Sequence, residues 1–351
     1  MKRNTIGKAI TVLSLAALGS LVPGLLRPAA TGKKPPERSP RILKTQFSYT
    51  AEVSEIPAGI NVLDVWLPIP SDTAMQKITG LKVDSSQPYR ITQEKKHGNR
   101  MVYFRIENPK KSFSSVVTFT IERFKPENSS ENHNGVHPEG YLKADSRVPV
   151  GGRFLSLAQE IIKDKTDPME KMRAIFDNTV ATMQYDYNKE SPRLGEGDVA
   201  FVCDYRKGNC SDLHSYLISL ARSVGIPAFL EYGFPIVGIP FSDTIPTEGK
   251  IAGYHCWTWF YISGKGWIPL DASDSRRWLD AKKADIAEKL FGDLVLERTA
   301  VAFSKGRDII LEPPQKNAPL NYFIYPYAEA DGKSVKASWE LSYKILSNGK
   351  H

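Results

Sequence analysis

The sequence predicts an α+β protein in which a β-sandwich-like domain precedes a domain of helices followed by a sheet. Apolar and polar residues alternate with a period of two in the first third of the chain, which is typical of half-buried strands. Helical spacing replaces this alternation from about residue 151, and further strand-like segments follow the helices. An order of helices first and sheet afterwards is typical of α+β folds.

The chain begins with a segment typical of an export signal. Basic side chains occur in residues 1–8, residues 9–26 carry no charge, and small residues then lead into a polar run over 31–40. We therefore expect residues 1–30 to be a signal peptide or, because eighteen uncharged residues approach a membrane-spanning length, an uncleaved anchor through residues 9–26. Either alternative predicts an exported protein, periplasmic or extracellular, with attachment to the membrane in the second case.

Much of the positive charge belongs to this first segment. The chain of 351 residues has a formal charge of +8, but residues 1–30 hold four basic residues and no acid, so the remainder carries +4. A balance of this size gives no reason to expect a nucleic-acid partner. With 41% hydrophobic and 25% charged residues, the full chain has an ordinary globular composition, which does not indicate an oligomeric state.

Residues 41–125 are predicted to form the β-sandwich-like domain. Strand-like segments occur at residues 47–53, 60–67, 101–106 and 117–121. Residues 126–150 are predicted to be a linker that is exposed up to Gly140, because this first part is rich in Pro, Asn, Ser and Glu and has almost no large apolar residue.

Three helices are expected at the start of the second domain, which is predicted to span residues 151–310. The first two, near residues 155–162 and 167–183, have the spacing of scaffold helices. The third is predicted to run from about Cys210 to Val224, with Asn209 as its N-cap and a glycine and a proline at its end. Cys210 is therefore expected in the first turn of a helix.

Strands are predicted after the third helix. They lie at residues 228–233, 255–262 and 267–270, with a loop rich in Gly, Pro, Ser and Thr over 235–249. Residues 311–351 are predicted to be a C-terminal extension, whose alternation from Val335 to Ile345 indicates a strand that joins one of the sheets.

Cys210 occupies a position that favours nucleophilic chemistry. Backbone N–H groups and the helix dipole stabilise a thiolate in the first turn of a helix. His255 opens one predicted strand and Asp271 ends the next, so the three residues offer a nucleophile, a base and a group that orients the base. The chain has three cysteines, so one thiol stays free in an exported protein even if the other two form a disulfide.

Four segments around these residues follow one another in a fixed order. They are Gly208-Asn-Cys-Ser-Asp212, Ala221-Arg-Ser-Val-Gly-Ile-Pro-Ala228, His255-Cys-Trp257 and Trp267-Ile-Pro-Leu-Asp271. In this order and spacing they resemble the transglutaminase-like branch of the papain-type thiol enzymes, and the β-rich segment before them is similar to the N-terminal domains of bacterial, exported members.

This resemblance implies a papain-like transglutaminase core, in which a helix that bears the cysteine packs on an antiparallel sheet. It also implies Cys210 as the nucleophile, His255 as the general base and then acid, and Asp271 as the group that orients the imidazole. The reaction implied is attack on an amide or ester carbonyl, in a peptide or protein substrate, with transfer of the acyl group to water or an amine. No cofactor and no metal ion are expected.

The register of the predicted hairpin tests this arrangement. A two-residue turn at Gly264-Lys265 would pair Asp271 with Thr258 and place it on the sheet face opposite to His255. A three-residue connection or a bulge shifts the register by one and brings the two side chains to one face. We predict the second geometry.

Three further residues are expected near the substrate. Trp257 is predicted to line the site and His214 to be a packed or substrate-lining residue. Tyr185, or Tyr187, offers a hydroxyl as a second oxyanion donor beside the N–H of Cys210, because no tryptophan lies between Gly151 and Cys210 as it does in animal transglutaminases. Each of the three also has an ordinary interpretation as a packed side chain.

Several alternatives remain open at this point. Asp274 could replace Asp271 as the orienting group, and Cys256, expected on the strand face away from His255 and outside the pocket, is either a packed residue or paired with Cys203. Soft and imidazole ligands from Cys203 to Cys256 could bind a metal, although their spacing is not that of a zinc ribbon or finger. The alternative function is an idle module that binds the cell envelope or a protein, and an occluded Cys210 would favour it.

Overall fold

The computed structural model describes residues 43–110, 112–124, 133, 135–239, 244–296 and 298–348. All of them belong to a unit that spans Ser39–His351. The expected signal or anchor at residues 1–30 and the linker at 31–40 lie outside the described residues. None of the helices in the described part of the chain has the length and apolar character needed to cross a membrane.

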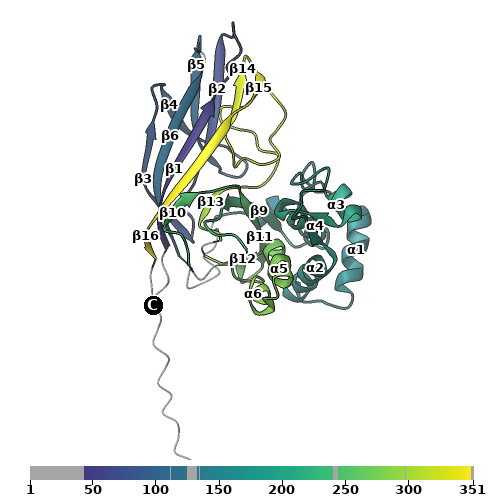
Figure 1. Ribbon diagram of the computed structural model, residues 1–351. Coiled ribbons are helices and arrows are strands. Elements are labelled where there is room, and N and C mark those ends of the chain that lie inside the picture. The colour runs from purple at the N-terminus through teal and green to yellow at the C-terminus, as the bar shows by residue number, and fades with distance from the viewer. Residues whose placement is uncertain are drawn as a thin grey trace, which may run out of the picture. The chain divides into compact units, whose positions relative to one another are not determined.

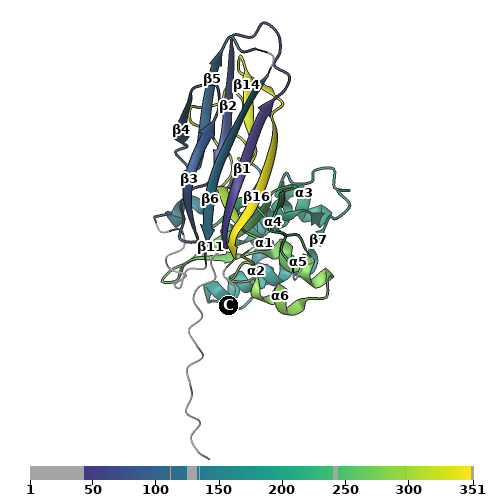
Figure 2. The same cartoon turned by 60° about the vertical axis from the view of Figure 1, so that its left-hand side comes forward.

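Two antiparallel sheets form the β-sandwich (Figures 1 and 2). The first sheet has the order β10–β16–β1–β6–β3, made of β10 (Glu248–Lys250), β16 (Ser338–Asn348), β1 (Leu43–Val53), β6 (Phe113–Arg123) and β3 (Gln76–Asp84). The second has the order β15–β14–β2–β5–β4, made of β15 (Lys333–Val335), β14 (Tyr327–Ala330), β2 (Val62–Ile69), β5 (Arg100–Glu107) and β4 (Tyr89–Gln93).

Alternation along the strands explains why the sheets pack. In β1 every second residue, including Phe47 and Tyr49, is buried, and β6 shows the same alternation. These side chains meet Val65 of β2 and Phe104 of β5 in one cluster of buried residues. A period of two buries one face of a strand and leaves the other to solvent, so this alternation is what holds the sandwich together.

Residues from the end of the chain complete both sheets. β16 pairs with β1 along nearly its whole length, from Leu43 opposite Asn348 to Glu52 opposite Ser338, and β14 pairs with β2. The strand expected from the alternation at 335–345 is β16. Its partner β1 lies almost 300 residues away in the sequence, and β14 and β15 are too short to give a clear periodic signal.

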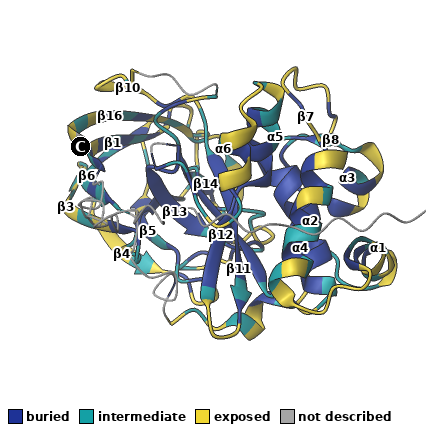
Figure 3. Ribbon diagram, turned by 90° about the horizontal axis from the view of Figure 1, so that it is seen from below, coloured by how far each residue is buried: buried dark blue, intermediate teal, exposed yellow. Residues whose placement is uncertain are grey.

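The second domain is built on the sheet β12–β11–β9–β13. Its strands are β9 (Ala228–Phe234), β11 (His255–Ile262), β12 (Gly266–Leu270) and β13 (Val301–Lys305), and its helices are α1 (Gly152–Ile162), α2 (Pro168–Thr182), α3 (Val199–Tyr205), α4 (Cys210–Ser223), α5 (Ala272–Asp280) and α6 (Ala284–Lys289). Figure 3 shows β11 and β12 buried within the fold, whereas the helices around them expose their outer faces. Helix α4 contacts β9, β11 and four other helices, so it is the central element of this domain.

The three helices expected from the sequence are α1, α2 and α4. Asp167 caps α2 by accepting hydrogen bonds from the backbone N–H groups of Met169 and Glu170, and Asn209 caps α4. Helices α3, α5 and α6 were not predicted, because each has nine residues or fewer and therefore gives little helical periodicity.

The stretch expected to be an exposed linker is exposed at Gly135, His137, Glu139 and Gly140, but His133 and the following Tyr141 pack on the core sheet. His133 lies edge-on to the ring of Phe229, with centroids 5.1 Å apart, and Tyr141 lies 4.7 Å from the same ring. Both side chains are buried. The expectation of exposure is wrong for His133, because a single aromatic ring in a polar stretch carries no periodic signal, whereas Tyr141 lies just after that stretch.

Packing between the C-terminal strand and the sandwich predicts a measurable loss of stability. Leu341 on β16 is fully buried in the core cluster, whereas Leu346 on the same strand is 48% exposed. Leu341→Ala should lower the free energy of unfolding by about 2–5 kcal/mol in urea denaturation. Leu346→Ala is the matched control and should change it by less than about 0.5 kcal/mol. Equal effects of the two substitutions would show that β16 is not part of the core.

Candidate active site

The start of helix α4 is fixed by a dense set of hydrogen bonds. The side chain of Asn209 accepts the N–H of Ser211 at 2.9 Å, and Asp212 accepts the N–H of Asn209 at 2.9 Å, which is a capping box. Asp212 also accepts the N–H groups of Gly195 and Gly197, each at 2.8 Å. The loop before α3 and the first turn of α4 are therefore tied together, and Cys210 is held as the first residue of the helix.

The hairpin that follows has the register that the sequence predicts. Thr258 lies opposite Leu270 and Ile262 opposite Gly266, so three residues connect β11 and β12. Gly264 and Gly266 have positive φ angles of 78° and 79°, which only glycine adopts easily. The register is shifted by one relative to a two-residue turn, and His255 and Asp271 lie on one face.

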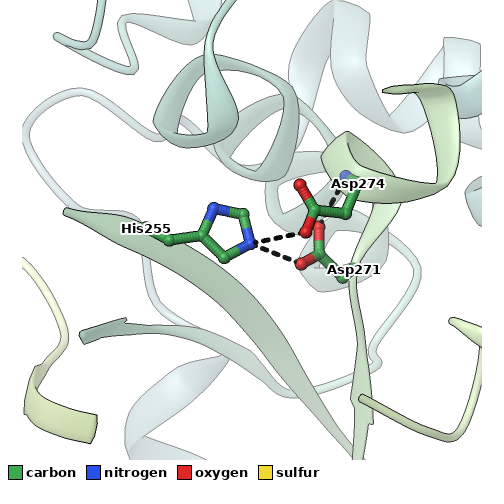
Figure 4. Close-up of side chains that lie close together, drawn as sticks. All are labelled: His255, Asp271 and Asp274. Atoms are coloured by element: carbon green, nitrogen blue, oxygen red, sulfur yellow. Dashed lines mark hydrogen bonds and ion pairs between the residues drawn. The ribbon is translucent and has the colours of Figure 1, made fainter. Parts of the chain in front are cut away.

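Two carboxylates approach the same nitrogen of His255 (Figure 4). Its Nε2 lies 2.6 Å from Oδ2 of Asp271 and 3.4 Å from Oδ2 of Asp274. Asp271 is the N-cap of α5, and its other oxygen accepts the N–H of Asp274 at 2.8 Å and the hydroxyl of Ser273 at 3.0 Å. Because Nε2 is engaged by the carboxylates, Nδ1 is the ring nitrogen left for Cys210.

The carboxylates favour a protonated imidazole. Burial alone would lower the pKa of His255, but the charges of Asp274 and Asp271 outweigh it and raise the pKa to about 9. Arg298 partly neutralises Asp274 through a hydrogen bond of 2.8 Å. The second carboxylate is therefore held in place by its own ion pair while it acts on His255.

The surroundings of Cys210 favour the thiolate. A hydrogen bond from the Cys256 thiol lowers the pKa of Cys210, burial opposes this, and the hydrogen bond and charge of His255 bring it well below its usual value. Burial and the neighbouring Cys210 raise the pKa of Cys256 well above its usual value. Cys256 therefore stays a thiol that donates, and Cys210 is favoured as the anion beside His255.

The place of Cys256 corrects an expectation. Its sulfur lies 3.6 Å from Nδ1 of His214 and 3.7 Å from Oγ of Ser211, both on α4. Its thiol also forms a hydrogen bond with the sulfur of Cys210. The prediction that it stays outside the pocket of Cys210 is wrong, because α4 lies against the face of β11 that carries Cys256. His255, the first residue of β11, also reaches the sulfur of Cys210.

No disulfide forms among the three cysteines, all of which lie in the described residues. The pairing of Cys203 with Cys256, which was one of two alternatives for Cys256, is therefore not formed in this structure. Cys256 instead is a packed residue with a polar contact to Cys210.

Two of the expected substrate residues lie behind the site. Trp257 has no exposed surface, its ring centroid is 6.1 Å from that of His255, and its indole N–H donates to Glu231 at 2.8 Å. His214 is also fully buried, with Nε2 at 3.3 Å from Oδ1 of Asp271. In this structure Trp257 supports the imidazole and His214 supports Asp271, and neither presents a surface to a substrate.

Tyr185 lies beside the thiol and is partly exposed. It belongs to β7 (Gln184–Tyr185), which pairs in parallel with β8 (Lys207–Gly208), so Tyr185 is opposite Gly208. The guanidinium of Arg277 lies 4.7 Å from its ring. Burial and the charge of Cys210 raise the pKa of Tyr185, so its hydroxyl stays protonated and can donate. Tyr187 instead donates its hydroxyl to Asp280 at 3.1 Å.

Some residues of the site gave no signal in the sequence. Arg298, which fixes Asp274, and Glu231, which accepts from Trp257 and Trp259, are single charged residues in stretches without a motif. Their importance follows from burial, which a sequence pattern does not report for an isolated polar residue.

One group in the described residues has the donors for a metal ion. Donor atoms of His255, Asp271 and Asp274 all lie within 4.8 Å of one another. These donors are already engaged, since Nε2 of His255 is bonded to Asp271 and Asp274 is paired with Arg298. The arrangement is therefore explained by orientation of the imidazole without a metal ion.

Comparison with known proteins identifies the domain that carries these residues. Residues 155–272 match the family model of the transglutaminase-like superfamily. Residues 155–272 are a transglutaminase-like core. This confirms the resemblance that the sequence shows, and it places Cys210, His255 and Asp271 inside the matched region.

Three relatives extend the comparison beyond the transglutaminase-like core. An uncharacterized protein of Haemophilus influenzae is 26% identical over 97% of this chain and 99% of its own length. The structure of a provisionally assigned cysteine protease from Cytophaga hutchinsonii aligns with a TM-score of 0.54 and 16% identity, over 89% of this chain and 93% of that one. The periplasmic domain of TgpA from Pseudomonas aeruginosa aligns with a TM-score of 0.34 and 14% identity, over 72% of this chain and 94% of that one. The Cytophaga structure shows that the α+β fold, sandwich included, is shared.

The protonation states of His255 and Cys210 affect the stability of the fold in opposite ways. The folded-state pKa of His255, about 9, lies above its ordinary value of 6.5, so its proton stabilises the fold below pH 6.5 and the contribution fades as pH rises through about 9. The pKa of Cys210 is lowered, so its thiolate stabilises the fold above the usual thiol pKa and the contribution is lost as pH falls. Because the two contributions to stability change with pH in opposite directions, the pKa of the His255 imidazole is the better quantity to measure.

Removing one carboxylate should shift the titration of His255. In Asp271→Asn the pKa of His255 should fall from about 9 to roughly 6–8, because one of two neighbouring negative charges is lost. Long-range proton–nitrogen NMR of the imidazole nitrogens measures this directly. Asp280→Asn, on the same helix but without contact to His255, should leave the titration unchanged. An unchanged pKa in Asp271→Asn would contradict the electrostatic account.

Proposed function

We propose that the protein is a thiol enzyme that attacks amide or ester carbonyls through Cys210 and passes the acyl group to water or to an amine. The observation that carries this proposal is the engagement of Nε2 of His255 by Asp271 at 2.6 Å, next to a helix-borne Cys210 whose thiolate is favoured. Acyl transfer by a thiol requires a nucleophile beside a base that a third group orients, and these three residues supply those groups. Peptides or proteins outside the cytoplasm are the proposed substrates.

In the first step the Cys210 thiolate attacks the carbonyl carbon. A carbon–sulfur bond forms, and the π electrons of the carbonyl move to its oxygen. The N–H of Cys210, the first residue of α4, is the proposed first donor to this oxyanion, and the hydroxyl of Tyr185 is the proposed second donor. The positive end of the helix dipole adds to this stabilisation.

In the second step the protonated His255 gives its proton to the leaving amine. The carbonyl re-forms, the carbon–nitrogen bond breaks, and an acyl-enzyme on Cys210 remains. The neutral imidazole then accepts a proton from water or an incoming amine, which attacks the thioester and releases Cys210. Asp271 keeps the ring oriented and stabilises its positive charge throughout.

The thiol is nearly covered in this structure. Cys210 is 3% exposed and His255 is 1% exposed. A substrate therefore reaches the thiol only when neighbouring side chains move, and under this proposal the structure is a closed state. The same observation favours a second candidate function, an idle transglutaminase-like module whose sandwich binds a protein or the cell envelope.

The proposed location follows from the first residues of the chain. Residues 1–30 have the order of basic, uncharged and small residues that is typical of an export signal or a membrane anchor. We therefore place the reaction in the periplasm or outside the cell, with attachment to the membrane if residues 9–26 are retained.

Trapping the acyl-enzyme tests the proposal. Incubation with a library of amide and ester substrates, followed by acid quench and intact mass spectrometry, should show a covalent adduct that maps to Cys210. Hydroxylamine should remove the adduct, because it cleaves a thioester. Cys210→Ala should show no adduct, and Cys203→Ala, which removes another buried thiol, should behave like the wild type.

The outcomes separate the two candidate functions. A Cys210 adduct that turns over would support the enzyme, and added amine would then show whether the acyl group passes to amines as well as to water. A folded protein with no adduct from any member of the library would contradict the enzyme and favour the idle module.

A further inference from the structure

Three partly exposed tyrosines stand together beside the first turn of α4. We call Tyr254, Tyr322 and Tyr325 the tyrosine wall. The ring of Tyr254 lies 5.5 Å from that of Tyr322 and 5.9 Å from that of Tyr325, measured between centroids. The backbone N–H of Tyr254 donates to the hydroxyl of Tyr325 at 3.2 Å. The three residues therefore form one connected surface.

The tyrosine wall adjoins the thiol. The hydroxyl of Tyr254 lies 2.7 Å from Oγ of Ser211, the residue that follows Cys210, and Tyr254 itself precedes His255 in the chain. Burial raises the pKa of all three tyrosines, and the nearby negative charge of Cys210 raises each further. Tyr254 therefore contacts the turn that carries Cys210, and Tyr322 and Tyr325 extend from it as neighbouring rings.

Tyr322 and Tyr325 come from outside the transglutaminase-like core, and the fold fixes them from two sides. The side chain of Asn321 donates to the backbone carbonyl of Glu196 at 2.8 Å, in the loop that also binds Asp212. On the other side the hydroxyl of Tyr49, in β1, donates to the carbonyl of Ile324 at 3.1 Å. The segment that carries both tyrosines is thus held between the core and the sandwich.

Two further aromatic rings pack against the tyrosine wall. The ring of Tyr322 stacks on the fully buried Tyr232 at 5.3 Å, and the ring of Tyr325 stacks on Trp339 of β16 at 4.7 Å. Rings supported in this way keep their position when a ligand binds, so little conformational entropy is lost.

The chemistry of the tyrosine wall indicates an uncharged ligand group. Arg307 is the nearby cation that acts on Tyr322, but it is buried and bonded to Ser215 and to the carbonyl of Glu196, so it is not offered to a ligand. Ring faces with hydroxyl edges bind flat aromatic or large apolar groups well.

We propose that the tyrosine wall is a substrate subsite that binds the aromatic or large apolar side chain of the residue whose carbonyl Cys210 attacks. This inference rests on the proposed function and adds to it a preference for the side chain of the acyl residue. The sandwich then takes part in the site, because it positions the segment that carries Tyr322 and Tyr325.

Two chloromethyl ketones test the subsite without requiring turnover. N-acetyl-phenylalanyl and N-acetyl-alanyl chloromethyl ketones alkylate a thiol and place their side chains where the acyl residue would lie. The wild type should react with the phenylalanyl reagent at least about tenfold faster. Tyr322→Ala should abolish most of this ratio and Tyr322→Phe should keep it. Tyr89→Ala, an exposed tyrosine on β4, should change nothing.

The outcomes distinguish failure of the subsite from failure of the proposed function. If Cys210 reacts with both reagents at similar rates in the wild type, the subsite is wrong and the thiol enzyme stands. That ratio decides the matter even if Tyr322→Ala does not fold.

If Cys210 reacts with neither reagent, the proposed function fails, and saturation-transfer NMR with N-acetyl-phenylalaninamide decides about the subsite. Binding that exceeds that of N-acetyl-alaninamide and is lost in Tyr322→Ala would support it. Equal binding of the two amides, or no binding, would overturn it.

Discussion

The hydrogen bond between Nε2 of His255 and Asp271 is the interaction on which the rest of the site depends. It forms because three residues, and not two, connect β11 and β12, which brings both side chains to one face of the hairpin. The bond turns Nδ1 toward Cys210 and raises the pKa of the imidazole, with Asp274 as a second carboxylate. A shift of one residue in this register would separate base from orienting group and leave Cys210 without a charged partner.

The opposite side of the site depends on the start of α4. Asp212 joins three backbone N–H groups there, so the position of Cys210 is set by buried hydrogen bonds and not by a flexible loop. The sandwich adds a third constraint, since Tyr49 holds the segment that carries Tyr322 and Tyr325. Parts of the chain that are distant in sequence thus position the surroundings of Cys210, and the sandwich and the core also share a continuous cluster of buried side chains.

Local chemistry made much of this predictable from the sequence. Caps and stop residues marked α4, because they depend on neighbours in the chain. Strand parity left two hairpin registers, and the expected pairing of His255 with Asp271 selected the one observed. Cys256 was misplaced because alternation tells which face a side chain takes but not which helix covers that face. The burial of His133 and Tyr141, the ion pair of Asp274 with Arg298, and the pairing of β16 with β1 arise from long-range packing, which no local pattern encodes.

If His255 holds Cys210 as a thiolate, the pH dependence of Cys210 alkylation must depend on His255. Iodoacetamide is small enough to report on a nearly covered thiol, and peptide mapping separates Cys210 from Cys203 and Cys256. Wild-type Cys210 should react well below about pH 7, whereas Cys210 in His255→Ala should lose this reactivity and titrate as an ordinary thiol with a pKa of about 8.5. The same ordinary thiol profile in both proteins would contradict a thiolate held by His255.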